Sequence, residues 1–456
     1  AFLIAIFVAF RPWKPGFFKK KGNLYLIFLL IVMFIVAWVV AALTRDACVT
    51  SSPTSVSVYQ TRKSNGDFCA KSAPMPCHVY LTFGTNASTS VIVHFHASSA
   101  YTTPSVLYSI DSSLSLQASA VSYKMDLEIN RWVYYAELTG LTPGTTYNFI
   151  VGDTTTASSM TANKMFRTAP SSGAFNFVSG GDLGTSSKTP LLVKAAAALE
   201  PLYMALGGDL AYANAMRSCY QRWDDWLKIY EDNAVTPTGL MVPVVASVGN
   251  HEAGGFDQTL SHLRFYSRYF VQESLAGRSP PDLPTHHVQY ISNQVMVALD
   301  SQVVETAASQ VNWLTTTLAA APAGSFKTAI YHAPAYPSIR PFSNSESTAV
   351  RTNFVPVFDQ QSLAISFENH DHAYKRTNRM KNSQNDPTGT LYVGDGAMGV
   401  TPRITQNPAI PSDKQYMVKY QGRSFFVHVN VNPADYSVDA IDDQGVVFDT
   451  FSNTYP

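Results

Sequence analysis

The sequence lacks a net charge and has few charged residues of either sign. Its 456 residues include 32 lysines and arginines against 32 aspartates and glutamates, and charged residues make up only 14% of the chain. This balance excludes a general electrostatic attraction to nucleic acid or to an acidic surface, so we expect no nucleic-acid partner. Apolar residues contribute 46%, which is enough for ordinary cores in two or three domains and argues against disorder. Any function must therefore come from local sites.

Charge is missing altogether from one stretch near the start of the chain. Residues 24–43, LYLIFLLIVMFIVAWVVAAL, form an apolar run of about the 20 residues that a helix needs to span a bilayer. The preceding residues 11–23 contain five basic side chains and no acidic one, and such an excess favours the cytoplasmic side. We expect residues 1–43 to be a membrane segment whose helix contacts lipid, with the rest of the chain on the exoplasmic or lumenal side.

The apolar residues 1–10 could be the end of an earlier membrane helix. A cleaved signal peptide is the alternative to a permanent anchor, but the long apolar run has no clear small-residue cleavage site, which favours an anchor.

Cysteine is scarce, and all four cysteines follow the apolar run. Their spacing does not resemble a zinc cluster, whereas an oxidising compartment would permit disulfides in three possible pairings. Cys69 with Cys77 is the local option, and Cys48 with Cys219 would then tie the segment after the membrane to the main domain. Asn86 begins the glycosylation triplet Asn-Ala-Ser, which we expect to be used on the same side of the membrane.

Short alternating runs follow a segment without periodicity. Residues 44–72 are rich in Ser, Thr and Lys, which indicates a linker. Between residues 73 and 170, runs such as HVYLTFGT and RWVYYAEL alternate apolar and polar residues between turns, which predicts an antiparallel β-sandwich. The stretch LTGLTPGTTYNFIVG (138–152) resembles the end of a fibronectin type III domain. His94 and His96 share one strand face and could hold a metal ion, but such a pair is more often solvent-facing.

A different pattern begins at residue 174 and extends to residue 456. Apolar runs typical of strands covered on both faces end in acidic, amide or imidazole residues, and helical segments such as 310–321 lie between some of them. Because functional groups collect at the carboxyl ends of strands in layered α/β folds, we expect these side chains to meet at one edge. They are Asp182, Asp209, Asn250, His332, His370 and His372.

This set of donors predicts a pair of metal ions. Oxygen and imidazole donors without a thiolate suit iron, zinc or manganese, and six ligands are too many for one tetrahedral ion. Two ions that share a bridging carboxylate would use them all. Tyr212 follows Asp209 by three residues, and a phenol with a pKa near 10 binds as phenolate only to a strong Lewis acid, which favours ferric iron in one position.

Five motifs, in this order, resemble those of the metallophosphoesterases and most closely those of the purple acid phosphatases. Three are intact: Gly181-Asp182-Leu183-Gly184, Gly208-Asp209-Leu210-Ala211-Tyr212 and Gly249-Asn250-His251-Glu252. The other two are Ala329-Ile330-Tyr331-His332, with Ala in place of Val, and Asn369-His370-Asp371-His372, with Asn in place of Gly. The resemblance covers nearly the whole chain after the linker. It implies an α+β multi-domain fold in which a fibronectin type III-like sandwich precedes a four-layer α/β/β/α catalytic domain.

The resemblance also implies ligands and roles. A ferric site would use Asp182, Asp209, Tyr212 and His372, and a site for divalent zinc, iron or manganese would use Asp209, Asn250, His332 and His370. Such a centre would hydrolyse a phosphate monoester by means of a metal-activated hydroxide. His251 would contact the phosphate beside Asn250, or would orient Asn250 or Asp209 through a hydrogen bond.

The chain departs from the plant-type members in one respect. Those proteins carry further histidines after the fourth motif, proposed to bind substrate and to protonate the leaving group, whereas residues 333–351 contain none. Arg340 could bind phosphate there but is a poor acid, and Glu346 could donate a proton only with a raised pKa.

Two alternative functions therefore stay open. The chain could be a membrane-anchored structural or binding subunit that keeps the metals, with membrane or protein-complex partners, or it could be a phosphodiesterase or pyrophosphatase.

Overall fold

The computed structural model describes residues 30–35, 48–52, 55–59, 67–127, 129–273 and 283–455. The chain divides into two units, Ala1–Asn65 and Gly66–Pro456. In the first unit, β1 (Cys48–Ser52) and β2 (Ser55–Tyr59) form an antiparallel hairpin inside the segment predicted to be a linker. The alternating serines and valines of SVSVY supply the period of two that a strand requires, a signal that the serine-rich composition obscured.

Most of the predicted membrane span at 24–43, and all of residues 1–10, lie outside the described residues. Residues 30–35 are helical, and the apolar side chains of residues 31–35 are exposed. In the ranges that the structure describes, every helix is too short or too polar to span a bilayer.

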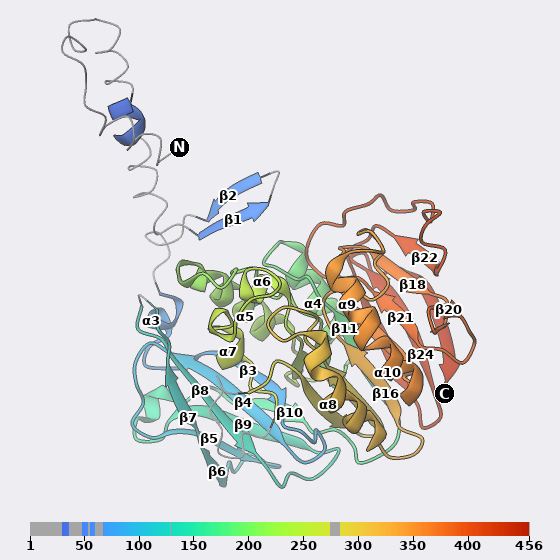
Figure 1. Cartoon of the computed structure of the whole chain (residues 1–456). Helices are drawn as coiled ribbons and strands as arrows, with labels where there is room; N and C mark the ends of the chain where they lie inside the picture. Colours follow the sequence, from blue (N-terminus) through green and yellow to red (C-terminus); the bar gives the residue numbers. More distant parts are fainter. Residues whose placement is uncertain are drawn as a thin grey trace, which may run out of the picture. The chain divides into compact units, whose positions relative to one another are not determined.

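Two large sheets form the centre of the second unit (Figure 1). In sheet order, the described strands of the first are β25 (Val447–Thr454), β24 (Asp435–Asp442), β23 (Phe425–Val431), β11 (Phe175–Gly180), β12 (Met204–Leu206), β13 (Val244–Ala246), β3 (Cys77–Phe83), β4 (Val91–Ala97), β8 (Trp132–Leu138) and β7 (Val121–Lys124). Those of the second are β14 (His287–Ile291), β15 (Gln294–Ala298), β16 (Phe326–Ile330), β17 (Ile365–Glu368), β21 (Leu391–Gly394), β18 (Tyr374–Thr377) and β22 (Met417–Gln421). Their inner faces share one core, in which the rings of Phe177 and Phe367 lie 5.7 Å apart.

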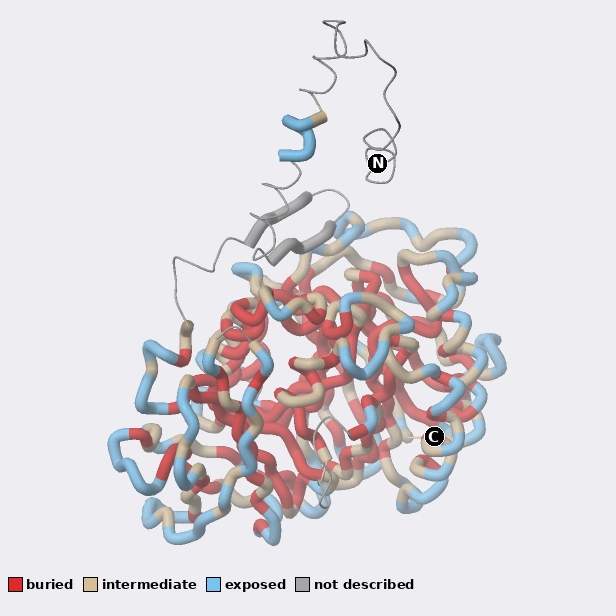
Figure 2. The backbone as a smooth tube through the Cα atoms, turned by 60° about the vertical axis from the view of Figure 1, so that its left-hand side comes forward, coloured by how far each residue is buried: buried red, intermediate tan, exposed pale blue. Residues whose placement is uncertain are grey.

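Helices cover the outer faces of both sheets. The helices α4 (Lys188–Ala197) and α5 (Tyr220–Asn233) pack against β23 and β3 of the first sheet. The helices α8 (Ala307–Ala319), α9 (Ser345–Asn353) and α10 (Val355–Gln361) share a second core with the outer face of the other sheet. This arrangement gives the four layers that the family resemblance implied, and Figure 2 shows the buried backbone running through their middle.

Shorter elements lie in the connections. They are α3 (Phe68–Ser72), α6 (Asn250–Ala253), α7 (Tyr266–Tyr269), β19 (Met380–Lys381), β20 (Gln384–Asn385), and the 3-10 helices Ala157–Ser159, Arg217–Cys219 and Leu260–His262.

The predicted sandwich is continuous with the rest of the second unit. A sheet of β10 (Lys164–Arg167), β9 (Thr146–Asp153), β5 (Pro104–Ser109) and β6 (Leu116–Ser119) packs against β3, β4 and β8. However, β3 also pairs in parallel with β13, through Thr82 and Val244. The predicted boundary between residues 170 and 174 falls between β10 and β11, but one sheet extends across it.

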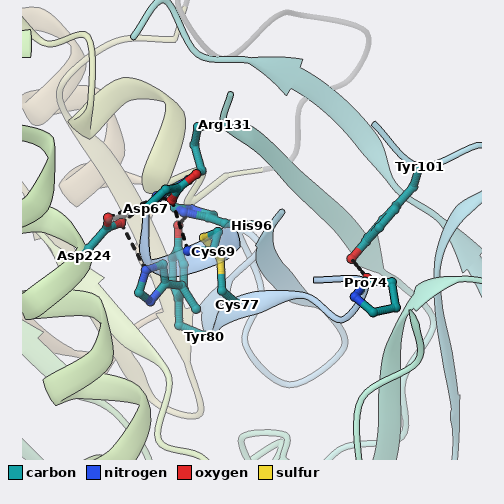
Figure 3. Close-up of a disulfide and its surroundings, with 10 residues drawn as sticks. Asp67, Cys69, Pro74, Cys77, Tyr80, His96, Tyr101, Arg131 and Asp224 are labelled. Carbon is teal, nitrogen blue, oxygen red and sulfur yellow. Dashed lines mark hydrogen bonds and ion pairs between the residues drawn. A yellow bond between two sulfur atoms is a disulfide. The ribbon is translucent and has the colours of Figure 1, made fainter. Parts of the chain in front are cut away.

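A buried ion pair joins the sandwich to α5, and a disulfide lies beside it, between α3 and β3 (Figure 3). Cys69 is bonded to Cys77, which confirms the local pairing, whereas the side chain of Cys48 lies outside the described residues and its pairing with Cys219 stays a prediction. Arg131, directly before β8, is fully buried, and its Nη2 donates to Asp224 Oδ2 of α5 at 3.0 Å and to Asp67 Oδ1 at 2.8 Å. These contacts fix the sandwich to the helical layer.

His94 and His96 are both fully buried, so the expectation of a solvent-facing pair was wrong. His94 Nε2 lies 2.9 Å from Thr82 Oγ1, and His96 Nε2 lies 3.1 Å from the Tyr80 hydroxyl. Burial lowers the pKa of His94 to about 3. The reason is tertiary, because the segment at residues 269–271 covers this face of β4 and accepts hydrogen bonds through its carbonyl groups.

Candidate metal centre

The predicted site residues follow the ends of neighbouring parallel strands. Asp182, Asp209 and Asn250 come after β11, β12 and β13, which pair in parallel in the first sheet. His332 follows β16, and the segment with His370 and His372 follows β17, its parallel neighbour in the second sheet. Parallel strands end at the same edge of a sheet, and this is where the side chains meet.

The possible ligand atoms form two groups that share Asp209. One contains Asp209, His332 and His370, and the other contains Asp182, Asp209 and His372. In each group, one donor atom from every residue lies within 4.8 Å of the others. The His370 Nδ1 and His332 Nε2 atoms are 3.0 Å apart, and His372 Nε2 is 3.0 Å from Asp182 Oδ1. A carboxylate shared in this way suits a bridge between two cations.

Asn250 and Tyr212 complete the surroundings of the two groups. Asn250 Oδ1 lies 3.0 Å from His332 Nε2 in the first group. The Tyr212 hydroxyl lies 3.2 Å from Asp182 Oδ1 and 3.3 Å from His372 Nε2 in the second. The other six side chains predicted as ligands therefore lie around Asp209.

The charge state of Asp209 fits metal binding. Burial opposes its ionisation, but the neighbouring His332 and His251 hold the pKa of this carboxyl well below its usual range. Its Oδ2 is buried and accepts no hydrogen bond from the described residues, although His332 Nε2 lies 3.3 Å away. A buried carboxylate oxygen without a donor is costly unless something else satisfies it, and a cation would do so.

The Tyr212 phenol needs a nearby cation of high charge to ionise. Burial and the charges of Asp182 and Asp209 raise the pKa of this phenol well above 10, so it stays protonated and donates to Asp182. Only a nearby cation of high charge would reverse this balance and hold the side chain as phenolate. The residues on this side of the centre therefore fit a trivalent ion.

The backbone at the centre adopts conformations that residues other than glycine normally avoid. Five of the seven residues have φ between 54° and 82°, in the left-handed region: Asp182, Asp209, Tyr212, His370 and His372. Such conformations are uncommon for residues other than glycine and cluster at functional sites. Gly396 is required at this edge, because a Cβ there would lie 1.7 Å from Asp182 Oδ2.

Glu252 ends the intact third motif, and its role was not predicted from the sequence. Its buried carboxylate accepts hydrogen bonds from the N–H groups of Asp209 at 2.7 Å, Leu210 at 2.8 Å and Gly249 at 2.8 Å. It therefore holds the second and third motifs together. Burial and the charge of Asp209 raise the pKa of Glu252 to about 8.

A buried ion-pair network behind the histidines was also missed. Lys375 Nζ contacts Glu368 Oε2 at 2.5 Å and Asp395 Oδ1 at 3.1 Å, and all three side chains are fully buried. Asp395 accepts the His372 N–H through its carbonyl, and Glu368 accepts the Ala335 N–H, beyond the fourth motif. Lys375 is 7 residues from Glu368 and 20 from Asp395, and none of the three belongs to one of the five motifs.

His251 lies at the exposed side of the centre. Its Nε2 is 3.8 Å from Asp209 Oδ2, its N–H donates to Asp209 Oδ1 at 2.8 Å, and its side chain is 30% exposed. Its Nδ1 contacts Asn214 Oδ1, which fixes the orientation of the ring.

Arg340 and Asn86 belong to neither group of possible ligand atoms. The Arg340 guanidinium donates to Asp371 and to the His370 carbonyl, so it already supports the loop of the fifth motif. Asn86 is exposed, and its Oδ1 accepts from the Ser88 N–H. Phosphate binding by Arg340 and glycosylation of Asn86 stay predictions.

Known proteins are similar to this chain in sequence and in fold. The family model described as Purple acid Phosphatase, N-terminal domain, matches residues 76–168. An uncharacterised protein of Mycobacterium tuberculosis is 26% identical over 75% of this chain and 69% of its own length. Purple acid phosphatase 13 of Arabidopsis thaliana is 25% identical over 62% of this chain and 57% of its own length. This chain thus spans little more than half of that plant relative.

Solved structures show the same fold. A purple acid phosphatase from yellow lupin (Lupinus luteus) seeds superimposes with a TM-score of 0.69 at 15% identity, over 83% of this chain and 74% of its own. PhoD superimposes with a TM-score of 0.64 at 11% identity, over 84% of this chain and 91% of its own. The fold is that of a metallophosphoesterase. Within that class the chain resembles the purple acid phosphatases, as its five motifs predicted.

Proposed function

We propose that this protein hydrolyses phosphate monoesters at a binuclear centre of ferric iron and divalent zinc, iron or manganese. The observation that carries the proposal is the buried Asp209 carboxylate, which two donor groups share and whose Oδ2 accepts no hydrogen bond from the described residues. When bound, the two ions would activate water as a nucleophile and stabilise charge on the phosphoryl oxygens.

The protein's own residues would hold and orient the reacting groups. The carboxylates and histidines fix the centre, and Glu252 holds Asp209 in place through its backbone. His251 is partly exposed, and its Nδ1 donates to Asn214 Oδ1, so its Nε2 would donate a hydrogen bond to a phosphoryl oxygen in the imidazolium form.

The experiment that tests this proposal compares two chromogenic esters with the same leaving group. The full chain, loaded with iron and zinc and checked by elemental analysis, is expected to hydrolyse p-nitrophenyl phosphate faster than bis(p-nitrophenyl) phosphate. Faster hydrolysis of the diester would favour the phosphodiesterase alternative. Inertness towards both esters, with metals bound, would favour the structural subunit.

Replacing Tyr212 with phenylalanine is expected to abolish the visible colour of the iron-loaded protein but to leave monoester hydrolysis within about 10-fold of wild type. A phenolate bound to ferric iron absorbs visible light, and phenylalanine removes that donor without removing a carboxylate or an imidazole. Absorption spectra and initial rates on the same sample provide the measurement. A variant that keeps the band would show that Tyr212 is not a ligand.

We also propose that residues 24–43 anchor the protein with its metal centre on the exoplasmic or lumenal side. The exposed apolar side chains of residues 31–35 support this proposal. In a eukaryotic secretory host, the full chain is expected to resist alkaline carbonate extraction and to shift in mobility after glycosidase treatment. The variant Asn86→Gln should lose the mobility shift but stay in the membrane pellet. If wild type showed no shift and was extracted by carbonate, both parts would be wrong.

A further inference from the structure

The first part of the loop after the fourth motif presents no side chain to a substrate. Residues 331–338 are all buried, and the charged Arg340 beyond them is bound to Asp371. This part of the loop therefore offers no side chain that could recognise the alcohol part of an ester.

The loop after the third motif carries such a group, Phe256. Its ring centroid lies 5.0 Å from that of His370, edge to face, and 6.4 Å from that of His332. These two histidines are nearly inaccessible to solvent, with exposed fractions of 6% and 0%, whereas Phe256 is partly exposed. Phe256 thus contacts the buried histidines and is itself partly exposed to solvent.

Backbone hydrogen bonds hold this loop in place on both sides of Phe256. The Gly255 N–H donates to the Asn250 carbonyl, and the N–H groups of Asp257 and Gln258 donate to the carbonyls of Gln302 and Val303, all at 2.8 Å. The Gln258 amide also donates to the Phe256 carbonyl at 2.8 Å. The backbone that carries the ring is therefore held before any ligand arrives, which lowers the entropic cost of binding against it.

We infer that Phe256 determines specificity and selects phosphate esters of aromatic or other apolar alcohols. This inference rests on the proposed function. A partly exposed aromatic ring contributes less to folding than a buried one, whereas next to a reacting centre it offers a flat apolar face for an alcohol group. Stacking against that face would favour phenyl over glycerol esters.

The test compares two esters in two variants. Replacing Phe256 with alanine is expected to lower kcat/KM for phenyl phosphate about 10-fold more than for glycerol 1-phosphate, since only the phenyl group loses an aromatic contact. The variant Phe256→Tyr should retain the wild-type preference. Phe342→Ala is the matched control: Phe342 is 39% exposed and packs against Tyr416 and Arg351, and its removal should leave the ratio unchanged.

A binding measurement separates this inference from the proposed function. Isothermal titration of the metal-loaded full chain is expected to show tighter binding of phenylphosphonate than of methylphosphonate, and Phe256→Ala should remove the difference. An inert enzyme that still showed this preference would overturn the hydrolase proposal but keep the subsite. An equal fall for both esters, or an unchanged phosphonate preference in Phe256→Ala, would mean that the ring only covers His370, and the inference would be wrong.

Discussion

Replacing Asp209 with asparagine is expected to reduce hydrolysis of a phosphate monoester by about 1000-fold or more. The substitution keeps the size of the side chain but removes the charge that both donor groups share. Its effect should exceed that of losing any single histidine, because Asp209 belongs to both groups and each histidine belongs to one. The protein should lose at least one metal ion per chain.

Initial rates and elemental analysis on the same preparation check this prediction. Asp126→Asn is the control, since Asp126 is 81% exposed and pairs with Arg217 on the surface; its activity should stay within about 2-fold of wild type. Unfolding curves should show that Asp209→Asn still folds. An Asp209→Asn protein with both metals and more than about a tenth of wild-type activity would contradict the bridging role.

Much of the second unit could be predicted because strand and motif signals are local. The apolar runs before Asp182, Asp209 and His332 become β11, β12 and β16, and the polar residue after each run marks its carboxyl end. What the sequence could not reveal is how the layers cover one another. His94 lies on a strand with an alternating pattern, but its burial depends on Val271, 177 residues away.

Some side chains around the centre could be predicted from the sequence, and others could not, for the same reason. The seven residues predicted as ligands each belong to a short motif, and the structure brings them together. The supporting residues act over long separations: Lys375 is 20 residues from Asp395, and Glu252 is 43 from Asp209. The left-handed backbone at His370 could not be predicted either, since histidine is enriched in this region but most histidines adopt other conformations.

Replacing Asp224 with alanine is expected to lower the free energy of unfolding by about 3–5 kcal/mol, the usual cost of removing one partner from a buried ion pair. Asp224 accepts hydrogen bonds from Arg131 and from His78 Nε2, the latter at 3.1 Å (Figure 3). Among the described residues, its removal leaves the fully buried Arg131 with Asp67 as its one charged partner. Chemical denaturation of the full chain at neutral pH measures the loss.

The same helix provides the control, and pH provides a second test. Asp232→Ala removes an exposed i,i+4 pair with Lys228 near the end of α5 and should cost at most about 1 kcal/mol.

The pH test depends on the charge of Asp224. Burial opposes ionisation of Asp224, but Arg131 holds its pKa well below the usual range. A lowered pKa in the folded state means that the ion pair stabilises the fold above about pH 4 and that this contribution is lost as the pH falls further. The difference in the free energy of unfolding between wild type and Asp224→Ala should therefore be constant from about pH 8 to 5 and shrink below that.

The double variant Arg131→Met with Asp224→Leu should recover most of the lost stability, because apolar side chains need no partner. If it were as unstable as Asp224→Ala alone, packing rather than charge would hold the sandwich to α5.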